Sequence, residues 1–306
     1  MRKLAVAVVL LALVGLGVFW FITAPSAVIA RNDDRLETGG DVALGREIFF
    51  AGGCASCHAT PKQDDALRLG GGLELKSPFG SFYAPNISSH PTDGIGRWRA
   101  ADLANAMMAG VSPDGAHYYP AFPYASYAGM KIEDVRHLMA FLRTTPAIEG
   151  KAPAHGLGFP FNIRRTLGVW KALFLDSTPV RDDPAQTAEW NRGRYLTEAL
   201  SHCAECHSPR NALGGIVVAQ RYAGGPELEG DGWVPNITPH RLKDWTKADM
   251  EQVLQIGITP EGDSVGGSMG SVVRNMSQLS AADRGAIAAY IVSLPARAGP
   301  ARPARQ

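Results

Sequence analysis

Two short runs of the sequence place two cysteines and a histidine at a fixed spacing. Residues 54–58 read Cys-Ala-Ser-Cys-His, and residues 203–207 read Cys-Ala-Glu-Cys-His. Thiols two residues apart at the start of a helix reach the two vinyl groups of one porphyrin, and the histidine that follows supplies an axial nitrogen to the iron. The spacing therefore predicts two covalently bound haem c groups. The haem-binding residues it predicts are Cys54, Cys57, His58, Cys203, Cys206 and His207.

A Cys-x-x-Cys pair alone also suits half of a zinc site or a redox dithiol. Here a histidine follows both pairs, and no further cysteine remains to complete a four-thiolate site. All four cysteines belong to the two motifs, so none is left for a disulfide, a nucleophile or a thiolate iron ligand. Covalently attached haem also indicates a location outside the cytoplasm.

A low-spin electron carrier needs a second axial ligand on each iron, and a methionine sulfur in that position raises the reduction potential. For the first haem, Met130 stands just before a predicted closing helix, whereas Met107 and Met108 fit the core of an earlier helix. We therefore predict Met130 as the ligand of the first iron. Among the histidines outside the motifs, His117 is the one alternative ligand that the sequence leaves open.

For the second haem, Met269 and Met276 both lie in the loop before the last predicted helix. Met269 stands among glycines and serines, so we predict it as the ligand, with Met276 as the alternative. The two predicted methionines occupy different places in the repeat. Met130 corresponds to Leu279, and the position nearest to Met269 in the first copy is around Phe122.

The composition is that of an ordinary globular protein. The chain has 306 residues, of which 45% are hydrophobic and 19% charged, and its formal net charge is +1. This balance gives no reason to expect nucleic acid or another strongly charged partner. By length, about two domains are expected.

The segments around the two motifs repeat each other. The run Pro-Asn-Ile occurs at residues 85–87 and 235–237, and Trp98 and Trp245 follow these runs. Such self-similarity indicates an internal duplication, so the predicted fold is all-α, with two tandem haem domains. Apolar periodicity predicts helices at residues 41–50, 98–110, 132–143 and 281–294. The predicted divisions are an anchor (1–30), a first haem domain (31–148), a linker (149–189), a second haem domain (190–297) and a disordered tail (298–306).

The N-terminal segment looks like a membrane span. Arg2 and Lys3 precede an uncharged apolar run at residues 4–22. This run approaches the ~20 residues that span a bilayer and exceeds the ~7–15 of a signal-peptide core. The two positive charges place the N-terminus in the cytoplasm, and the aromatic residues 19–21 fit the far interface. We predict an uncleaved signal-anchor; the alternative is a cleaved signal peptide, with residues 28–30 as the cleavage site.

A second apolar pattern lies in the linker. Ile163, Leu167, Trp170 and Phe174 fall on one face of a helix. We predict that this amphipathic helix docks on the second haem domain. The alternative is that it lies on the membrane or on a partner subunit.

Five longer runs of the sequence are shared with a known family. They span residues 83–88, 94–98, 119–124, 190–195 and 202–211. They resemble the membrane-anchored cytochrome c subunits of periplasmic bacterial dehydrogenases. This group includes the subunits of quinoprotein alcohol, gluconate-type flavin and molybdenum aldehyde dehydrogenases. The resemblance covers about residues 35–296, although many such subunits carry three haems and this chain has two motifs.

The resemblance implies class I cytochrome c-type domains with His/Met ligation at the bacterial inner membrane, facing the periplasm. It also implies a dehydrogenase catalytic subunit as electron donor and a downstream cytochrome, terminal oxidase or quinone as acceptor. Six further residues are implied to line the haem propionates: Asn86, Asn236, Trp98, Trp245, Arg210 and Asn211.

The predicted function is electron transfer by a dihaem c-type cytochrome that breaks no substrate bond and is not itself an enzyme. The alternative is a dihaem redox enzyme, either peroxidase-like or oxidising sulfur compounds, with one open iron. The choice depends on Met130, because the first haem is open if this residue is not a ligand.

Overall fold

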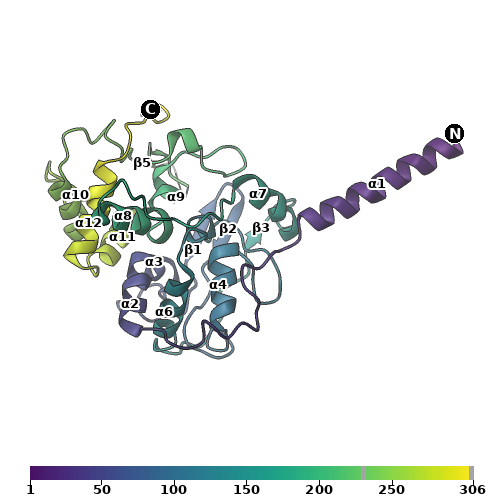
Figure 1. Ribbon diagram of the computed structural model, residues 1–306, viewed down its shortest axis with the longest axis horizontal. Coiled ribbons are helices and arrows are strands. Elements are labelled where there is room, and N and C mark those ends of the chain that lie inside the picture. The colour runs from purple at the N-terminus through teal and green to yellow at the C-terminus, as the bar shows by residue number, and fades with distance from the viewer. Residues whose placement is uncertain (229, 231, 303–306) are drawn as a thin grey trace.

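The computed structural model describes residues 1–228, 230 and 232–302, and shows a mostly helical body from which one long helix projects (Figure 1). In its N-terminal half the helices are α2 (Val42–Ala51), α3 (Cys54–His58), α4 (Ala100–Ala109), α5 (Tyr124–Tyr127) and α6 (Ile132–Leu142). In its C-terminal half they are α8 (Ala188–Tyr195), α9 (Cys203–His207), α10 (Lys247–Ile256), α11 (Ser268–Met276) and α12 (Ala281–Val292). The projecting helix is α1 (Arg2–Ile22), and α7 (Leu167–Phe174) lies between the halves in sequence.

Each half is closed by the crossing of its first and last helices. A Cβ added to Gly45 of α2 would lie 2.0 Å from the carbonyl oxygen of His137 in α6. A Cβ added to Gly193 of α8 would lie 1.9 Å from the carbonyl oxygen of Ala286 in α12. Only glycine permits this backbone-to-backbone approach. Gly45 stands nine residues before the first cysteine of its motif and Gly193 ten, so the two glycines have the same packing role in the repeat.

The elements leading to and from these crossings also correspond. Asp41 caps α2 by accepting hydrogen bonds from the next backbone amides, as N-cap carboxylates do. α4 and α10 both end at a glycine in the left-handed region, Gly110 with φ 59° and Gly257 with φ 72°. This conformation is a common helix stop. It explains why a glycine stands 12 residues after Trp98 and again 12 residues after Trp245.

One insertion distinguishes the halves. The chain between Gly193 and Cys203 is one residue longer than that between Gly45 and Cys54. The extra residue is accommodated by a π-helical turn, Leu196–Leu200, that continues α8. Single π-helical turns of this kind are the usual result of a one-residue insertion within a helix.

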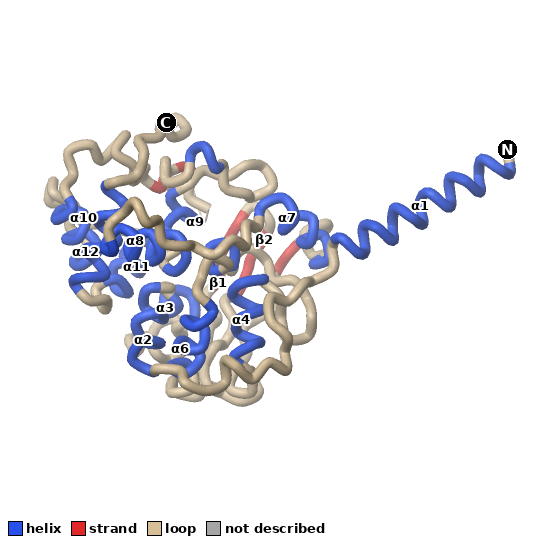
Figure 2. The backbone as a smooth tube through the Cα atoms, viewed as in Figure 1, coloured by secondary structure: helices blue, strands red, loops and turns tan. Residues whose placement is uncertain are grey.

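The chain is mostly helical, as predicted, but the all-α expectation missed two small sheets (Figure 2). β1 (Glu74–Ser77), β2 (Gly80–Tyr83) and β3 (Gly156–Leu157) form an antiparallel sheet in that order, and β4 (Gly225–Pro226) pairs with β5 (Trp233–Val234). The hairpin between β1 and β2 is closed by the Ser77 hydroxyl, which donates to the Gly80 carbonyl oxygen over 2.8 Å. The glycine-rich sequence of this region concealed the strands.

α1 is 21 residues long and stands outside the body. The most apolar stretch of α1 has a mean hydropathy of 2.8, and none of it is buried in the body. Among the described residues, α1 is the one helix that is long and apolar enough to cross a membrane. This agrees with the length-based prediction of a span.

α7 contacts both halves and the end of α1, whereas the sequence predicted docking on the second half. Lys171 donates to the carbonyl oxygens of Ala109 and Gly110 at the end of α4, over 2.6 and 2.7 Å. The Trp170 indole donates to the Leu213 carbonyl oxygen in the C-terminal half over 3.0 Å. The helical pattern predicted the element correctly, but its partners come from three parts of the chain.

The predicted disordered tail begins in contact with the body. The Ala298 carbonyl oxygen accepts a hydrogen bond of 3.3 Å from the Gln220 side chain, and Gly299 packs on the Ala223 carbonyl. Residues 303–306 lie outside the described residues.

Candidate haem sites

Each Cys-x-x-Cys-His run forms one short helix, α3 or α9. Its two cysteines are three residues apart, so one helical turn brings their sulfurs to the same side. Both helices start after a residue in the left-handed region: Gly53 with φ 62° and His202 with φ 42°. A histidine there is uncommon, and His202 is held by contacts described below.

The motif histidines are oriented alike. In both, Nδ1 lies 2.8 Å from a proline carbonyl oxygen: Pro85 for His58 and Pro235 for His207. Nδ1 must carry the proton to donate this bond, so Nε2 is left as the nitrogen that can bind a metal. Burial lowers the pKa of both imidazoles and favours the neutral form that ligates.

The asparagines that follow these prolines hold the carbonyls in place. Asn86 donates to the Ile148 and Gly150 carbonyl oxygens over 2.7 and 2.9 Å. Asn236 donates to the Arg297 carbonyl oxygen over 2.8 Å. Each therefore ties the histidine-supporting loop to the segment after the closing helix. Their predicted contact with haem propionates stays a prediction.

The cysteines of the two motifs are arranged for haem attachment. Burial is the largest cause that raises the pKa of Cys54 and Cys203 to about 12. In the described part of the chain, no group of three or more His, Cys, Asp or Glu side chains is placed to hold a metal ion. Each motif instead combines two cysteines with one histidine, which fits thioether attachment of haem.

The candidate methionines differ in burial. Met130 is 1% exposed, lies in the main apolar cluster and immediately precedes the first residues of α6. Met269 is half-buried in the first turn of α11, and Met276 is 2% exposed at its end. The Nε2 of His117 lies 2.9 Å from the Thr23 carbonyl oxygen, while its buried Nδ1 has no hydrogen-bond partner in the described part of the chain, so His117 stays the alternative ligand.

The other predicted residues lie on the periphery of the motifs. Trp98 lines an open hollow with Arg31, Pro113, Asp114 and Tyr118. In the corresponding place, the Trp245 indole donates to Glu261 over 3.4 Å. Arg210 pairs with the Glu205 carboxylate over 2.5 Å and donates to the Gly214 carbonyl oxygen over 2.7 Å. The first interaction attaches Arg210 directly to the second motif.

Each motif helix contacts an element of the opposite half: α3 meets α11, and α9 meets α5. Asn275 donates to the Ser56 hydroxyl over 2.9 Å, and the Ser126 hydroxyl donates to the Glu205 carboxylate over 2.9 Å. Ser56 and Glu205 stand at the same position of the two motifs, and Ser126 and Asn275 also correspond, since the numbers in each pair differ by 149. The contact is therefore close to two-fold symmetric.

A second set of contacts joins the residues just before the two motifs. The Tyr127 hydroxyl donates to the Gly52 carbonyl oxygen over 2.8 Å, and its ring meets the His202 ring edge-on at 5.7 Å. His202 Nε2 also lies 3.3 Å from the same carbonyl oxygen. The sequence alone suggests a surface or loop position for His202, and it does lie in the short loop before α9, half-buried. What the sequence did not indicate is its contact with Gly52 and Tyr127. The repeat could have indicated that His202 has a special role, because this histidine occupies the position of Gly53 in the first copy.

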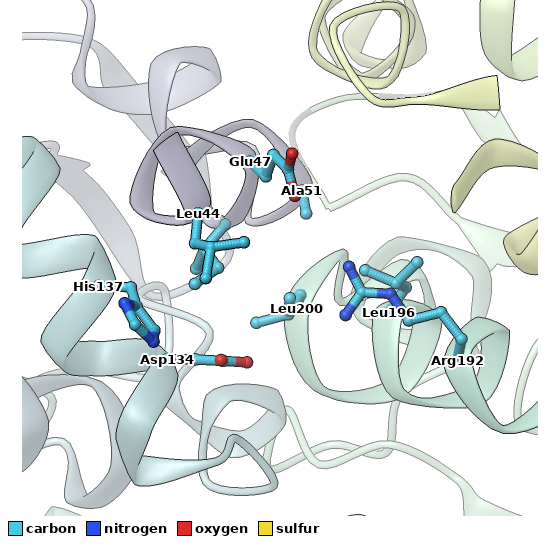
Figure 3. A pocket seen from close by; sticks show the side chains of 9 residues that line it. Leu44, Glu47, Ala51, Asp134, His137, Arg192, Leu196 and Leu200 are labelled. Atoms are coloured by element: carbon cyan, nitrogen blue, oxygen red, sulfur yellow. The ribbon is translucent and has the colours of Figure 1, made fainter. Parts of the chain in front are cut away.

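A small cavity lies near this contact, between α2, α6 and α8 with its π-helical extension (Figure 3). Its volume is about 80 Å³, well below the ~300 Å³ at which ligand pockets begin. Glu47, Asp134, His137 and Arg192 line it. The size makes it a packing gap between the halves rather than a substrate site.

Comparisons with known proteins agree with this geometry. The Cytochrome c family model matches residues 42–146. A "Diheme cytochrome c-type" protein of Cereibacter sphaeroides is 47% identical over 96% of this chain and 99% of its own length. One subunit of the nicotinate dehydrogenase of Pseudomonas putida is 38% identical over 82% of the chain and 21% of its own length. The fructose dehydrogenase cytochrome subunit of Gluconobacter japonicus is 35% identical over 84% and 53%.

The repeated motif helices and the proline-supported histidines define a c-type cytochrome. By the near full-length match to the Cereibacter relative, the chain belongs to the diheme c-type cytochromes, and it carries two covalently bound haem c groups. It spans only about half the length of the fructose dehydrogenase subunit, so that protein's activity does not transfer directly.

Proposed function

We propose that this chain is the electron-transfer subunit of a membrane-bound dehydrogenase, built as two tandem class I cytochrome c domains. The observation that carries the proposal is the two-fold contact between the halves, in which Asn275 of α11 donates to Ser56 of the first motif and Ser126 of α5 donates to Glu205 of the second. It supports a relay within one chain, because each haem-attachment segment contacts the opposite half. The domains are residues 31–148 and 190–297, joined by the linker 149–189.

Each bound haem iron would be held by one histidine and one methionine: His58 with Met130, and His207 with Met269. Bound haem supplies a one-electron couple between ferric and ferrous iron. The chain's part is to hold Nε2 of each histidine toward the iron through the proline carbonyls and to keep the first site dry with the buried Met130. A closed sixth position supports electron transfer over ligand chemistry.

Electrons cross between the halves at the contact of Gly52, Tyr127 and His202. These residues lie just before the motifs or pack on them, and the contacts of His202 with the Tyr127 ring at 5.7 Å and with the Gly52 carbonyl oxygen at 3.3 Å join the two halves. Electron tunnelling favours such short, packed paths over gaps. Two haems in one chain thus connect a donor on one side to an acceptor on the other.

α1 serves as an uncleaved anchor in the inner membrane, with both haem domains in the periplasm. Residues that follow α1 are part of the body: Asn105 accepts from the Val28 and Ile29 amides over 2.9 and 3.1 Å, and Arg31 pairs with the buried Asp102 over 2.8 Å. Cleavage after residue 30 would remove part of this packing. These contacts support the anchor over the cleaved signal peptide.

The electron donor is the catalytic subunit of a periplasmic dehydrogenase, and the acceptor is a downstream cytochrome, terminal oxidase or quinone. The relatives from Gluconobacter and Pseudomonas, whose names identify dehydrogenase subunits, support this class of donor. The second Cys-x-x-Cys-His domain supports a relay role rather than a single carrier.

The proposal is tested by tagging the full chain, solubilising membranes and identifying the proteins that co-purify. We expect a dehydrogenase catalytic subunit, and its substrate should reduce both haems of the complex under anaerobic conditions. The matched variant Met130→Leu should keep both covalent haems but open the first iron to carbon monoxide. If the substrate of a co-purified dehydrogenase reduces neither haem, the proposed electron donor is wrong. If the unmodified chain binds carbon monoxide, the open-haem enzyme is favoured instead.

A further inference from the structure

We propose that the linker segment at residues 159–173 lies in the headgroup layer of the membrane, with bilayer lipid as the partner of an exposed apolar face. This inference rests on the proposal that α1 spans the membrane. The face, called the interfacial face below, consists of Phe159, Phe161, Ile163, Val169 and Leu173.

The linker is locked to the end of α1. Thr23 follows α1 and is fully buried, and its carbonyl oxygen accepts a 2.9 Å hydrogen bond from His117. Arg165 donates to the Thr23 hydroxyl over 3.0 Å. A Cβ on Gly168 would lie 2.5 Å from the Thr23 Cα atom, so the first turn of α7 packs backbone to backbone on this residue. The span therefore cannot swing freely relative to α7.

The length of α1 then sets the height of α7. Its 21 residues extend about 31 Å at 1.5 Å per residue, close to the ~30 Å hydrocarbon thickness of a bilayer. With α1 in the membrane, its last turn is at the outer boundary. Any element packed on Thr23 lies within the headgroup layer. α7 and β3 are the parts of the body at the base of α1 (Figures 1 and 2).

The side chains at this height suit that layer. The exposed fractions are 82% for Phe159, 45% for Phe161, 42% for Ile163, 40% for Val169 and 61% for Leu173. Val169 and Leu173 are four residues apart on α7 and so share one face. A concentration of exposed apolar side chains of this kind marks an interaction surface.

The charged residues of the segment are arranged accordingly. Lys171 turns inward to the carbonyl oxygens at the end of α4, so the outward face of α7 remains apolar. Arg165 lies over the Trp20 ring at 4.0 Å, near the membrane boundary where aromatic and cationic side chains gather. An apolar face bordered by the cationic Arg165 matches the way amphipathic helices lie on anionic lipid. Continuity with the span makes lipid the occupant.

The test uses cysteine accessibility in the purified full chain in lipid nanodiscs. The native cysteines are bound to haem as thioethers, so one introduced cysteine reacts alone. The test variants are Phe159→Cys and Leu173→Cys. Ile256→Cys is the matched control, because it is apolar, 57% exposed and at the end of α10, far from α1. Two haems per chain are verified for each variant.

We expect a charged, membrane-impermeant maleimide to react with the test cysteines about tenfold or more slowly than with the control, as burial of a leucine-sized side chain implies. A long-chain alkyl maleimide should reverse this preference. Equal reactivity of the test and control cysteines in nanodiscs would overturn the inference. Protection that occurs in native membranes but not in nanodiscs would do the same, and would assign the face to a protein partner.

A fourth variant separates this inference from the anchor proposal. Leu13→Cys lies in the middle of α1 and should be unreactive toward the charged reagent if α1 spans the bilayer. If Leu13→Cys is protected and Leu173→Cys is reactive, the inference alone fails. If Leu13→Cys is reactive, α1 does not span the bilayer, and the inferred position of α7 in the headgroup layer is contradicted as well.

Discussion

The two halves of the molecule share the same crossing of terminal helices and the same support of the motif histidine, but they differ in the side chains packed beside the crossing. Gly45 and Gly193 let the terminal helices cross in the same way, and Pro85 and Pro235 support the motif histidines at the same 2.8 Å. The interiors beside these crossings are unlike. This comparison separates residues that build a haem-binding half from those that can tune it.

In the N-terminal half the side chains beside the helix crossing are aromatic or aliphatic. Phe49 is fully buried and its ring packs on Phe141 at 5.2 Å and on Phe50 at 5.1 Å. Leu69, whose carbonyl oxygen accepts from the Ile87 amide, is also fully buried.

In the C-terminal half a polar network occupies the same place. Tyr290 corresponds to Phe141, because it is the residue that packs on Gly193 as Phe141 packs on Gly45. Its hydroxyl donates to Glu198 over 2.6 Å, and Glu198 also pairs with Arg221. Tyr222, which corresponds to Leu69, is 1% exposed.

The network lies close to the second haem attachment. Glu198 and Arg221 both lie within electrostatic reach of Cys203. A polar surrounding favours the more highly charged ferric state, so we expect the second haem to have the lower potential of the two. Electrons would then pass from the C-terminal to the N-terminal half.

The largest expected effect tests the shared helix crossing. Gly45→Ala and Gly193→Ala each force a Cβ onto a backbone carbonyl, and each should lower the free energy of unfolding by about 3 kcal/mol. Chemical denaturation followed by circular dichroism measures this. Gly266→Ala is the control, since nothing lies within 4 Å of its added Cβ. If only one of the two variants loses stability, the helix crossings of the two halves are not equivalent.

The next effect tests the difference between the interiors. Glu198→Leu leaves the Tyr290 hydroxyl and Arg221 without their acceptor and should cost about 2 kcal/mol. It should also raise the potential of the second haem alone, because a negative charge that favours ferric iron is removed. Glu189→Leu, which breaks an exposed pair with Lys247, serves as control and should change neither quantity. An unchanged potential in Glu198→Leu would separate the network from haem tuning.

The halves should also differ in acid sensitivity. Burial lowers the pKa of His117 below 6.5, and nearby Lys171 and Arg165 add to the effect. The unfolded chain therefore binds a proton that the folded chain does not, and stability falls as the pH drops below about 6.5. Below about pH 6.5, the stability of His117→Gln should therefore fall less steeply with decreasing pH than that of the unmodified chain, by up to about 1.4 kcal/mol per pH unit. Ser264 takes the corresponding bridge position in the C-terminal half, so Ser264→Ala should leave the pH profile of thermal denaturation unchanged.

The smallest expected effect tests the symmetry of the contact between the halves. Ser56→Ala and Ser126→Ala each remove one hydrogen bond, but Asn275 keeps its bond to Ser271 and Glu205 keeps Arg210. Each variant should lose about 1 kcal/mol or less, and the double variant should show the sum. A loss several times larger in one variant would mean that the contact is not symmetric in energy.

Local spacing explains what the sequence could predict. The motifs, the repeat, the helix positions and the apolar span depend on residues within a few turns of one another. The Pro-Asn-Ile runs are recognisable as repeats, but their role is not, because His58 Nδ1 meets Pro85 only after the intervening loop folds back. The contact of His202 with Gly52 joins residues 150 apart, which no local pattern indicates.

The polar network was also beyond sequence reasoning, for a specific reason. Glu198 has the pattern of a solvent-facing residue of an ordinary helix, but it lies within the π-helical turn, and its carboxylate reaches Tyr290 in α12. The linker helix is indicated by its period, while its docking on Thr23 depends on Gly168 having no side chain. Irregular turns and backbone contacts are the features that pattern alone could not supply.

The most direct test of a closed two-haem relay is an anaerobic spectroelectrochemical titration of the purified full chain. We predict two one-electron waves of equal amplitude, with the methionine–iron band present in both oxidised haems and no carbon monoxide binding by either reduced haem. A single wave, or a haem that binds carbon monoxide, would contradict the relay.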